Sequence, residues 1–263
     1  MDLSQIKMVV TDMDGTLLNS KHEVSSRFFE IYEELKKKNI AFVAASGRQY
    51  HSMVDKLESI KNEILVIAEN GALIRKQEET LLTTPINKSE VHRILDTVLP
   101  LENVHPVLCC QNNAFVGGDS NEFLEMLQEY YSEFEIVDDQ KNVNEEVLKI
   151  AIYHFENSEK HIYPNVKHLE CDLKVKVSGA NWVDVSDLNA HKGYALKKVM
   201  DEFQIASNEI MVFGDYNNDL EMLELSDYSF AMANAHPNVL KTAKYTTHSN
   251  DDFGVERILE KLL

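Results

Sequence analysis

Short apolar runs that end in small or polar residues recur along this chain. Four of them share the pattern: IKMVVTDMDG (6–15), IAFVAASGR (40–48), EILVIAENGA (63–72) and EIMVFGDYNND (209–219). Near-continuous apolar strands of this length are typical of a parallel sheet that is buried on both faces. The pattern therefore predicts four buried parallel strands, each with its polar residues at the carboxyl end.

Helical spacing of apolar residues appears between and after these runs. Residues 28–35 place apolar side chains three and four positions apart, ahead of a lysine run, which predicts a strand, helix, strand unit. Residues 196–203 repeat the spacing before the fourth run, and residues 255–262 predict a closing helix. Both ends of the chain therefore predict an α/β fold with a Rossmann-like parallel sheet.

The middle of the chain has a different pattern. Residues 91–98 and 123–131 have helical spacing, and strand patterns occur in VLCCQ, AFVGG, KIAIYHF, DLKVKVSG and WVDVSD, the last two joined as a hairpin through Gly179. Such a mixture predicts a small α+β domain inserted into the larger one. We expect a core made of residues 1–82 and 189–263, with residues 83–188 as the insertion.

Composition and charge narrow the class of protein. The chain has 263 residues, of which 44% are hydrophobic, and a formal net charge of -18, from 26 basic and 44 acidic residues. That charge would repel a phosphate backbone, so we expect no nucleic-acid partner. The opening residues lack the basic start and apolar stretch of a signal peptide, and no apolar run reaches the roughly 18 residues of a membrane span. The expected location is cytoplasmic. The three cysteines form neither an even disulfide set nor a C-x-x-C pair, which favours reduced thiols.

Chemistry-bearing residues follow the predicted strands. Ligands of an open parallel sheet bind beyond the carboxyl ends of its strands, so these residues should converge although they are far apart in sequence. The residues that end the four runs are Asp12 and Asp14; Ser46, Gly47 and Arg48; Asn70 and Gly71; and Asp215, Asn218 and Asp219. Carboxylates with a hard cation, backed by hydroxyl and amide donors, suit a phosphate ester.

The carboxylates favour Mg²⁺ as the cation. Mg²⁺ prefers oxygen ligands and usually takes few protein carboxylates beside water and substrate phosphate, and Asp12, Asp14 and Asp215 could supply them. Lys192 adds a second positive charge. A carboxylate can also attack phosphorus to give an aspartyl-phosphate, and a second one, two residues away, can protonate the leaving oxygen and later deprotonate water.

Each piece also has a purely structural interpretation. D-x-D before glycine is often a turn or helix cap. It also matches the start of a calcium-binding loop, but that match fails because Leu17 and Leu18 stand where such a loop places its later ligands. Ser46 with Gly47 is ordinary turn chemistry, and Lys192 alone would be a solvated lysine at a helix start. Their joint placement at strand ends favours a site.

Four motifs resemble those of the haloacid dehalogenase superfamily of phosphohydrolases, in particular its Cof-type subclass with a large inserted α/β cap. DMDGTLL (12–18) is similar to the nucleophile loop, ASGR (45–48) to the second motif, HKGYAL (191–196) to the lysine motif and GDYNNDLEML (214–223) to the metal motif. The motifs occur in the family's order, and the resemblance covers the whole chain, including ENGA (69–72).

The resemblance implies a role for each matched residue. Asp12 would be the nucleophile and Asp14 the general acid/base, with the Asp14 carbonyl on Mg²⁺, and Thr16 would help to hold the acid/base. Asp219 would ligate the metal directly or through water. The implied substrate-side residues are Thr16, Ser46, Gly47, Arg48, Asn70, Lys192 and Asn218, and the implied metal ligands are Asp12, Asp14, Asp215 and Asp219.

Two segments depart from the family pattern. AMANA (231–235) stands where A-M-G-N-A is common, so Ala233 replaces a glycine and leaves the backbone less permissive. DVSDLNAHKG (184–193) differs from the usual sequence before the lysine, with His191 in place of serine. Both departures concern the substrate entrance rather than the chemistry.

The predicted function is a Mg²⁺-dependent phosphatase for small phosphorylated metabolites, with sugar phosphates as the leading class. The alternatives are a phosphatase for a phosphorylated cofactor such as pyridoxal phosphate or flavin mononucleotide, a phosphomutase of the same fold, and a phosphate-sensing module without turnover. Phosphate release from a monophosphate without a bisphosphate activator separates a phosphatase from a mutase. The expected partner is a small phosphorylated metabolite, with no nucleic acid and no membrane.

Overall fold

The chain divides into two compact units. The computed structural model describes residues 3–118, 120–128, 131 and 134–263. Residues 1–82 and 191–263 form the core unit, and residues 83–190 form the inserted unit. The second boundary lies two residues beyond the expected 188, directly before the helix that begins at Lys192.

An eight-stranded sheet forms the centre of the core unit, in the order β14-β13-β12-β1-β2-β3-β4-β5. Its bounds are β1 (Met8–Asp12), β2 (Ala41–Ala45), β3 (Leu65–Ala68), β4 (Leu73–Lys76), β5 (Glu79–Thr83), β12 (Ile210–Gly214), β13 (Tyr228–Ala231) and β14 (Tyr245–Thr246). The strands from β14 to β3 are parallel, and β4 is antiparallel to β3. The predicted α/β fold is confirmed.

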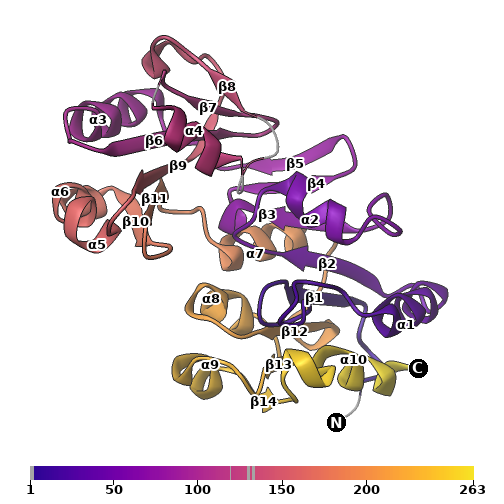
Figure 1. Cartoon of the computed structure of the whole chain (residues 1–263). Coiled ribbons are helices and arrows are strands. Elements are labelled where there is room, and N and C mark those ends of the chain that lie inside the picture. The colour runs from indigo at the N-terminus through magenta and orange to yellow at the C-terminus, as the bar shows by residue number, and fades with distance from the viewer. Residues whose placement is uncertain (1–2, 119, 129–130, 132–133) are drawn as a thin grey trace. The chain divides into compact units, whose positions relative to one another are not determined.

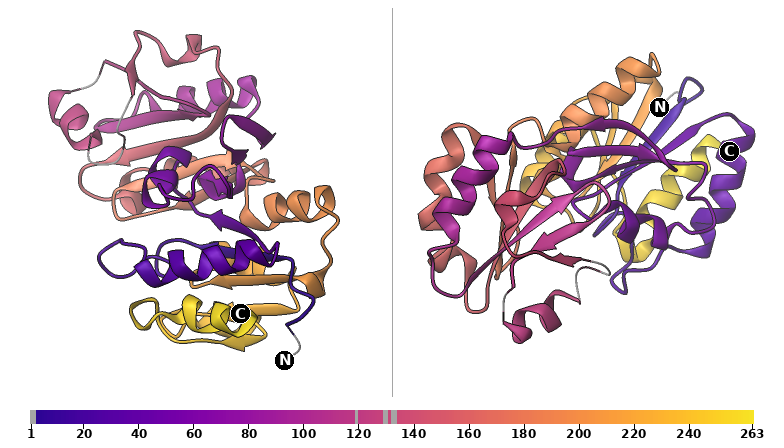
Figure 2. Two further views of the ribbon diagram at one scale, coloured as in Figure 1. Left: turned by 90° about the vertical axis from the view of Figure 1, so that its right-hand side faces the viewer. Right: turned by 90° about the horizontal axis from the view of Figure 1, so that it is seen from above.

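The N-terminal and C-terminal segments meet at the centre of this sheet. Val10 in β1 lies opposite Val43 in β2 on one side and Val212 in β12 on the other. In both views of Figure 2 the orange and yellow strands of the C-terminal segment continue the sheet of indigo and purple strands. All five residues of β1 and of β12 are buried, as expected for strands covered on both faces.

Helices cover both faces of the core sheet (Figure 1). They are α1 (Ser26–Lys37), α2 (Tyr50–Lys56), α7 (Lys192–Glu202), α8 (Leu220–Leu223), α9 (Pro237–Thr242) and α10 (Gly254–Leu259). Short 3-10 turns are η1 (Glu69–Gly71), η4 (Ser207–Glu209), η5 (Asn217–Asp219), η6 (Asn250–Asp252) and η7 (Glu260–Leu262). The Ser25 side chain caps α1 by accepting the Phe28 N–H, and α1 packs on α10, whereas α7 packs on α8. The buried face of α1 is the one its spacing predicts.

The inserted unit has a six-stranded sheet in the order β10-β11-β9-β6-β7-β8. Its strands are β6 (Val104–Cys110), β7 (Ala114–Val116), β8 (Glu135–Ile136), β9 (Val147–His154), β10 (Leu173–Val177) and β11 (Trp182–Asp187). Its helices are α3 (Lys88–Val98), α4 (Asn121–Leu127), α5 (Ser158–His161) and α6 (Tyr163–Val166), with 3-10 turns η2 (Gln140–Asn142) and η3 (Lys167–Cys171). The expected β10–β11 hairpin is present. The expected helix 123–131 ends earlier, at Leu127, and residues 129 and 130 lie outside the described residues.

Alternate residues of β6 contribute to two separate hydrophobic clusters of the inserted unit. Leu108 and Cys110 join the cluster with α3 and α6, and Val107 and Cys109 join the cluster with Phe123 of α4. The three cysteines are unbridged. Within the described part of the chain, no helix has both the length and the apolar character that a membrane crossing needs.

Candidate active site

The parallel strands bring the predicted residues to one edge of the core sheet. Asp12 ends β1 directly opposite Ala45, the last residue of β2. Thr11 lies opposite Phe213, so β12 ends at the same level and Asp215 follows it at once. The register of the sheet therefore fixes how far apart these carboxylates lie.

Lys192 joins two of these carboxylates. It is the first residue of α7, and its side chain is fully buried. Its Nζ lies 2.5 Å from Asp12 Oδ1 and 2.7 Å from Asp219 Oδ1. Burial alone would lower the pKa of Lys192, but attraction to Asp12 and Asp219 outweighs burial and raises it. The lysine therefore stays charged and holds the Asp12 carboxylate in one orientation.

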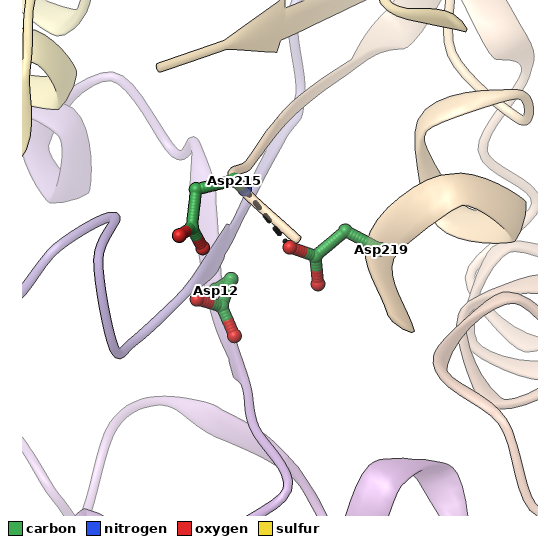
Figure 3. Close-up of side chains that lie close together, drawn as sticks. All are labelled: Asp12, Asp215 and Asp219. Atoms are coloured by element: carbon green, nitrogen blue, oxygen red, sulfur yellow. Dashed lines mark hydrogen bonds between the residues drawn. The ribbon is translucent and has the colours of Figure 1, made fainter. Parts of the chain in front are cut away.

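Three carboxylates form a cluster at this point. One oxygen from each of Asp12, Asp215 and Asp219 lies within 4.8 Å of the other two, and Figure 3 shows them pointing toward one another. Burial raises the pKa of Asp12 well above its usual value, against the opposing charge of Lys192. Burial and the charge of Asp219 raise the pKa of Asp215 to about 6. Such mutual repulsion is what a bound cation relieves, and an all-oxygen donor set fits Mg²⁺.

Asp219 is held by hydrogen bonds on both of its carboxylate oxygens. Its Oδ2 accepts the backbone N–H groups of Asp215 at 2.9 Å and Tyr216 at 3.1 Å, and its Oδ1 accepts from Lys192. The side chain has no exposed surface. This arrangement suits a residue that fixes the backbone of Asp215 and the position of Lys192.

Asp14 follows Asp12 by two residues but is more exposed and has a different partner. Arg48 holds it with two hydrogen bonds, from Nε to Oδ2 at 2.7 Å and from Nη2 to Oδ1 at 2.6 Å. His22 Nδ1 lies 3.4 Å from Asp14 Oδ1, and the Asp14 side chain is 41% exposed. Burial acts to raise the pKa of Asp14, but the hydrogen bonds and charge of Arg48 outweigh it and lower the pKa. Its carboxylate is not part of the acidic cluster, and the metal contact of its backbone carbonyl that the resemblance implies stays a prediction.

Thr16 has a different partner from the expected one. Its hydroxyl donates to Asp215 Oδ1 at 3.2 Å, whereas the expectation was that it would hold Asp14. The reason lies at Gly15, which has a left-handed φ of +78°: a Cβ built there would lie 2.3 Å from Asp215 Oδ2. The loop therefore turns so closely past Asp215 that Thr16 reaches that carboxylate, and Arg48 holds Asp14 instead.

Ser46, Gly47, Asn70 and Asn218 form the polar side of the site. Ser46 is buried, and its Oγ accepts the Arg48 N–H at 3.1 Å, which leaves its hydroxyl proton available as a donor. Asn70 has a left-handed φ of 54°, and its Oδ1 accepts from Asn218 Nδ2 at 3.0 Å. A Cβ on Gly47 would approach the Asn70 amide at 3.0 Å, so these two loops pack closely. The polar groups after β2, β3 and β12 thus meet.

The structure also contains contacts that the motifs did not indicate. His22 beside Asp14 had no sequence signal. Asn234 donates to the Gly15 carbonyl and Asn250 to the Leu18 carbonyl, both at 2.8 Å. Asn234 lies within AMANA, a segment that the sequence singles out for Ala233 alone.

Comparison with known proteins places this site in a family. The model of the haloacid dehalogenase-like hydrolases matches residues 9–259, which is nearly the whole chain. This chain belongs to the haloacid dehalogenase-like hydrolase family. As a member it is a hydrolase, and the predicted family resemblance is confirmed.

Individual relatives of this hydrolase agree with the family match. The chain is 30% identical over 265 residues to a 5-amino-6-(5-phospho-D-ribitylamino)uracil phosphatase, YbjI, of Escherichia coli, covering 98% of this chain and 96% of the relative. It is 26% identical to YcsE of Bacillus subtilis, which is also named a 5-amino-6-(5-phospho-D-ribitylamino)uracil phosphatase, covering 97% of this chain and 94% of the relative. The crystal structure of TM0651 from Thermotoga maritima superposes with a TM-score of 0.87 at 26% identity, over 97% of each chain. These relatives fit a phosphomonoester hydrolase.

Proposed function

We propose that this hydrolase is a Mg²⁺-dependent phosphatase that hydrolyses small phosphorylated metabolites through a phosphorylated Asp12. The observation that carries the proposal is the cluster of Asp12, Asp215 and Asp219 around the buried Lys192, with Asp14 held separately by Arg48. One carboxylate is thereby prepared as a nucleophile and the other as an acid/base.

In the first step, the Asp12 carboxylate attacks phosphorus and the bond to the leaving oxygen breaks, while Asp14 donates a proton to that oxygen. In the second, Asp14 removes a proton from water, the water oxygen bonds to phosphorus, and the bond to Asp12 breaks. Lys192 holds the attacking carboxylate. When bound, Mg²⁺ would offset the negative charge of the ester and of the residues expected to hold it, which are Asp12, Asp215, the Asp14 carbonyl and, directly or through water, Asp219.

Arg48 has two tasks in this proposal. Its bonds favour ionised Asp14, whereas the first step needs a protonated acid. An incoming phosphate offers the guanidinium a second anionic partner, so substrate binding weakens its hold on Asp14. In this proposal Arg48 bonds Asp14 before the substrate binds and contacts the phosphate afterwards, so both contacts occur within one catalytic cycle. Ser46, Asn70 and Asn218 are the expected donors to the phosphate oxygens.

Four relatives carry the name of a 5-amino-6-(5-phospho-D-ribitylamino)uracil phosphatase, and that compound is the phosphate ester of a sugar alcohol joined to a uracil ring. We therefore propose it as the first substrate to test, within the class of sugar phosphates and their reduced forms. Flavin mononucleotide follows, because it has the same phosphorylated ribityl chain. The cytoplasmic location expected from the sequence stays a prediction.

The test is release of inorganic phosphate by the purified protein with Mg²⁺ from a panel of monophosphates, with Asp12→Asn as the blank. We expect release from the ribityl and sugar phosphates without any bisphosphate activator. Transfer of phosphate to a second position of the substrate, with none released, would instead show a mutase. Binding without either reaction would show a phosphate sensor.

A further inference from the structure

The nucleophile loop, residues 12–20, turns most tightly at Gly15, and glycine is the residue whose backbone is least restrained. Gly15 has φ +78° and lies so near Asp215 that a side chain would collide with it. Glycine loses more conformational freedom on folding than any other residue, so its own preferences do not fix this turn. Contacts from elsewhere in the chain are needed to hold it.

Two asparagines from the C-terminal part of the core unit supply such contacts. Asn234 Nδ2 donates to the Gly15 carbonyl and Asn250 Nδ2 to the Leu18 carbonyl, both at 2.8 Å. The Asn250 N–H donates to Asn234 Oδ1 at 3.2 Å, which links the two side chains. Carbonyls only accept and N–H groups only donate, so each amide has a single orientation that satisfies these bonds.

The Gly15 carbonyl belongs to the same planar peptide unit as the Thr16 nitrogen. Fixing that carbonyl therefore fixes where Thr16 leaves the turn, and the Thr16 hydroxyl donates to Asp215. Beyond the turn, Leu17 N donates to the Asp12 carbonyl at 3.3 Å and Leu18 N to the Met13 carbonyl at 2.8 Å. The asparagine contacts thus hold two carbonyls of the turn that follows directly on Asp12 and Asp14.

We propose that Asn234 and Asn250 are positioning residues, which set the nucleophile loop in its reactive geometry without touching the substrate. The role as stated rests on the proposed function. Asn234 is exposed, and an exposed amide hydrogen bond contributes little to overall stability because water replaces it. Its loss should therefore appear in catalysis and in the mobility of the loop rather than in the melting temperature.

Four variants test the proposal: Asn234→Ala, Asn250→Ala, the double variant, and Asn238→Ala as a matched control. Asn238 is also exposed, lies four residues from Asn234, and donates from Nδ2 to Asn217 Oδ1 at 3.0 Å. We expect kcat to fall about tenfold or more in each single variant, since small misplacements of reacting groups are costly. KM should change less than twofold. The double variant should lose less than the product of the single effects, because the two side chains act on one loop.

Hydrogen–deuterium exchange of residues 13–20 tests the same contacts without any turnover. We expect faster exchange there in Asn234→Ala and Asn250→Ala, and wild-type exchange in Asn238→Ala. Unchanged exchange of this segment would overturn the proposal, as would a loss of kcat that Asn238→Ala shares or that, in Asn234→Ala, accompanies a lowered melting temperature. If the wild-type protein releases no phosphate from any ester, the proposed function fails, and the exchange measurement still decides whether the asparagines hold the loop.

Discussion

Three buried charged side chains, Asp12, Lys192 and Asp219, meet at one site of the core unit, whereas in the inserted unit the nearly buried Lys149 and Asp184 form a looser pair at 3.7 Å. At the ends of β1 and β12, Lys192 contacts two carboxylates in the interior. In the inserted unit, Gln140 donates to the carbonyls of Pro106 and Phe115, and Ser158 donates to Gly179. Neutral groups bonded to backbone serve the fold, whereas buried charges are costly to assemble. The buried charges of the core site therefore lower the stability of the fold, which is the pattern expected of a catalytic site.

Removing the nucleophile should have the largest effect. In Asp12→Asn the amide keeps the shape of the side chain but cannot attack phosphorus, so we expect turnover to fall by at least about 10⁴-fold. The melting temperature should change little, because the amide oxygen can still accept from Lys192, which keeps Asp219 as its charged partner. Steady-state kinetics and thermal unfolding measure the two effects, and residual turnover near the wild-type rate would show that Asp12 is not the nucleophile.

Lys192→Met should come next, because it leaves Asp12 and Asp219 buried without their common partner. Breaking a buried ion pair in this way costs about 3–5 kcal/mol. Lys197→Met is the matched control: Lys197 lies on the same helix and pairs with Asp201 at 2.6 Å on the surface, so its loss should cost about 0.5 kcal/mol or less. Denaturation in urea compares the two variants, and equal losses would contradict the contrast between buried and exposed charge.

Asp14→Asn should distinguish the role of Asp14 as acid/base from that of Asp12 as nucleophile. The variant keeps the nucleophile but lacks the acid, so esters with an alcohol leaving group should react about 10²- to 10⁴-fold more slowly. 4-Nitrophenyl phosphate, whose leaving group needs no proton, should form the phosphorylated enzyme more readily, and that species should accumulate. Mass spectrometry of peptides after acid quench detects phosphate on Asp12. Equal losses for both kinds of ester would argue against general acid catalysis by Asp14.

Burial, together with repulsion between the carboxylates, raises the pKa values of Asp12 and Asp215, so a divalent cation that offsets their charge should stabilise the core unit. At a Mg²⁺ concentration of 100 times its dissociation constant, the gain is about 2.7 kcal/mol. Thermal unfolding of EDTA-treated protein with added Mg²⁺ measures it. Asp215→Asn should lose most of this response, whereas an equal response in that variant would exclude Asp215 as a ligand.

The smallest effect concerns the inserted unit and pH. His154 Nδ1 accepts the Glu156 N–H at 3.1 Å, and its ring stacks on His161 at 4.2 Å. Burial lowers the pKa of His154, and the charge of His161 lowers it further, as do His105 and Lys160, against the opposing charge of Glu156. Since the folded pKa lies below the ordinary value of about 6.5, the unfolded chain takes up the proton first. Stability should therefore fall as the pH drops below about 6.5.

His154→Asn should remove that dependence, because the amide oxygen can accept the same N–H and does not titrate in this range. Trp182, the chain's single tryptophan, lies in the inserted unit, so its fluorescence reports denaturation there. The measurement compares pH 7.5 with pH 5.5. The same loss of stability on acidification in the variant and in the wild-type protein would rule out His154 as its source.

The sequence predicts the strands of the core and the residues at their ends because both follow from local patterns. Apolar runs define β1, β2, β3 and β12, and parallel pairing then brings Asp12, Ser46, Asn70 and Asp215 together. The short strands from β13 to β14 and the β4–β5 edge were not predicted. These strands have two to five residues, and buried and exposed positions are mixed in β5, so no long apolar run in the sequence predicts them.

Side-chain partners within the site were harder to predict than its members. Thr16 was expected on Asp14, but the structure pairs it with Asp215, and the contact of Arg48 with Asp14 was not predicted. These partners depend on the exact path of the turn at Gly15, which sequence spacing does not determine. Asn250 lies in a different segment of the chain from the loop it contacts, so no local pattern could have indicated it.

The position of β1 in the sheet has a consequence for synthesis on the ribosome. Val10 is made early, yet one of its two neighbours is Val212, which follows the whole inserted unit. At about 5–20 residues per second, the nascent chain waits many seconds with one edge of β1 unpaired. The inserted unit, whose strands pair among themselves, can fold during that wait, while the catalytic edge cannot assemble until Lys192 and β12 emerge. A nascent chain stalled just after residue 190 has left the exit tunnel should therefore carry a folded insertion and an incomplete, chaperone-accessible half sheet.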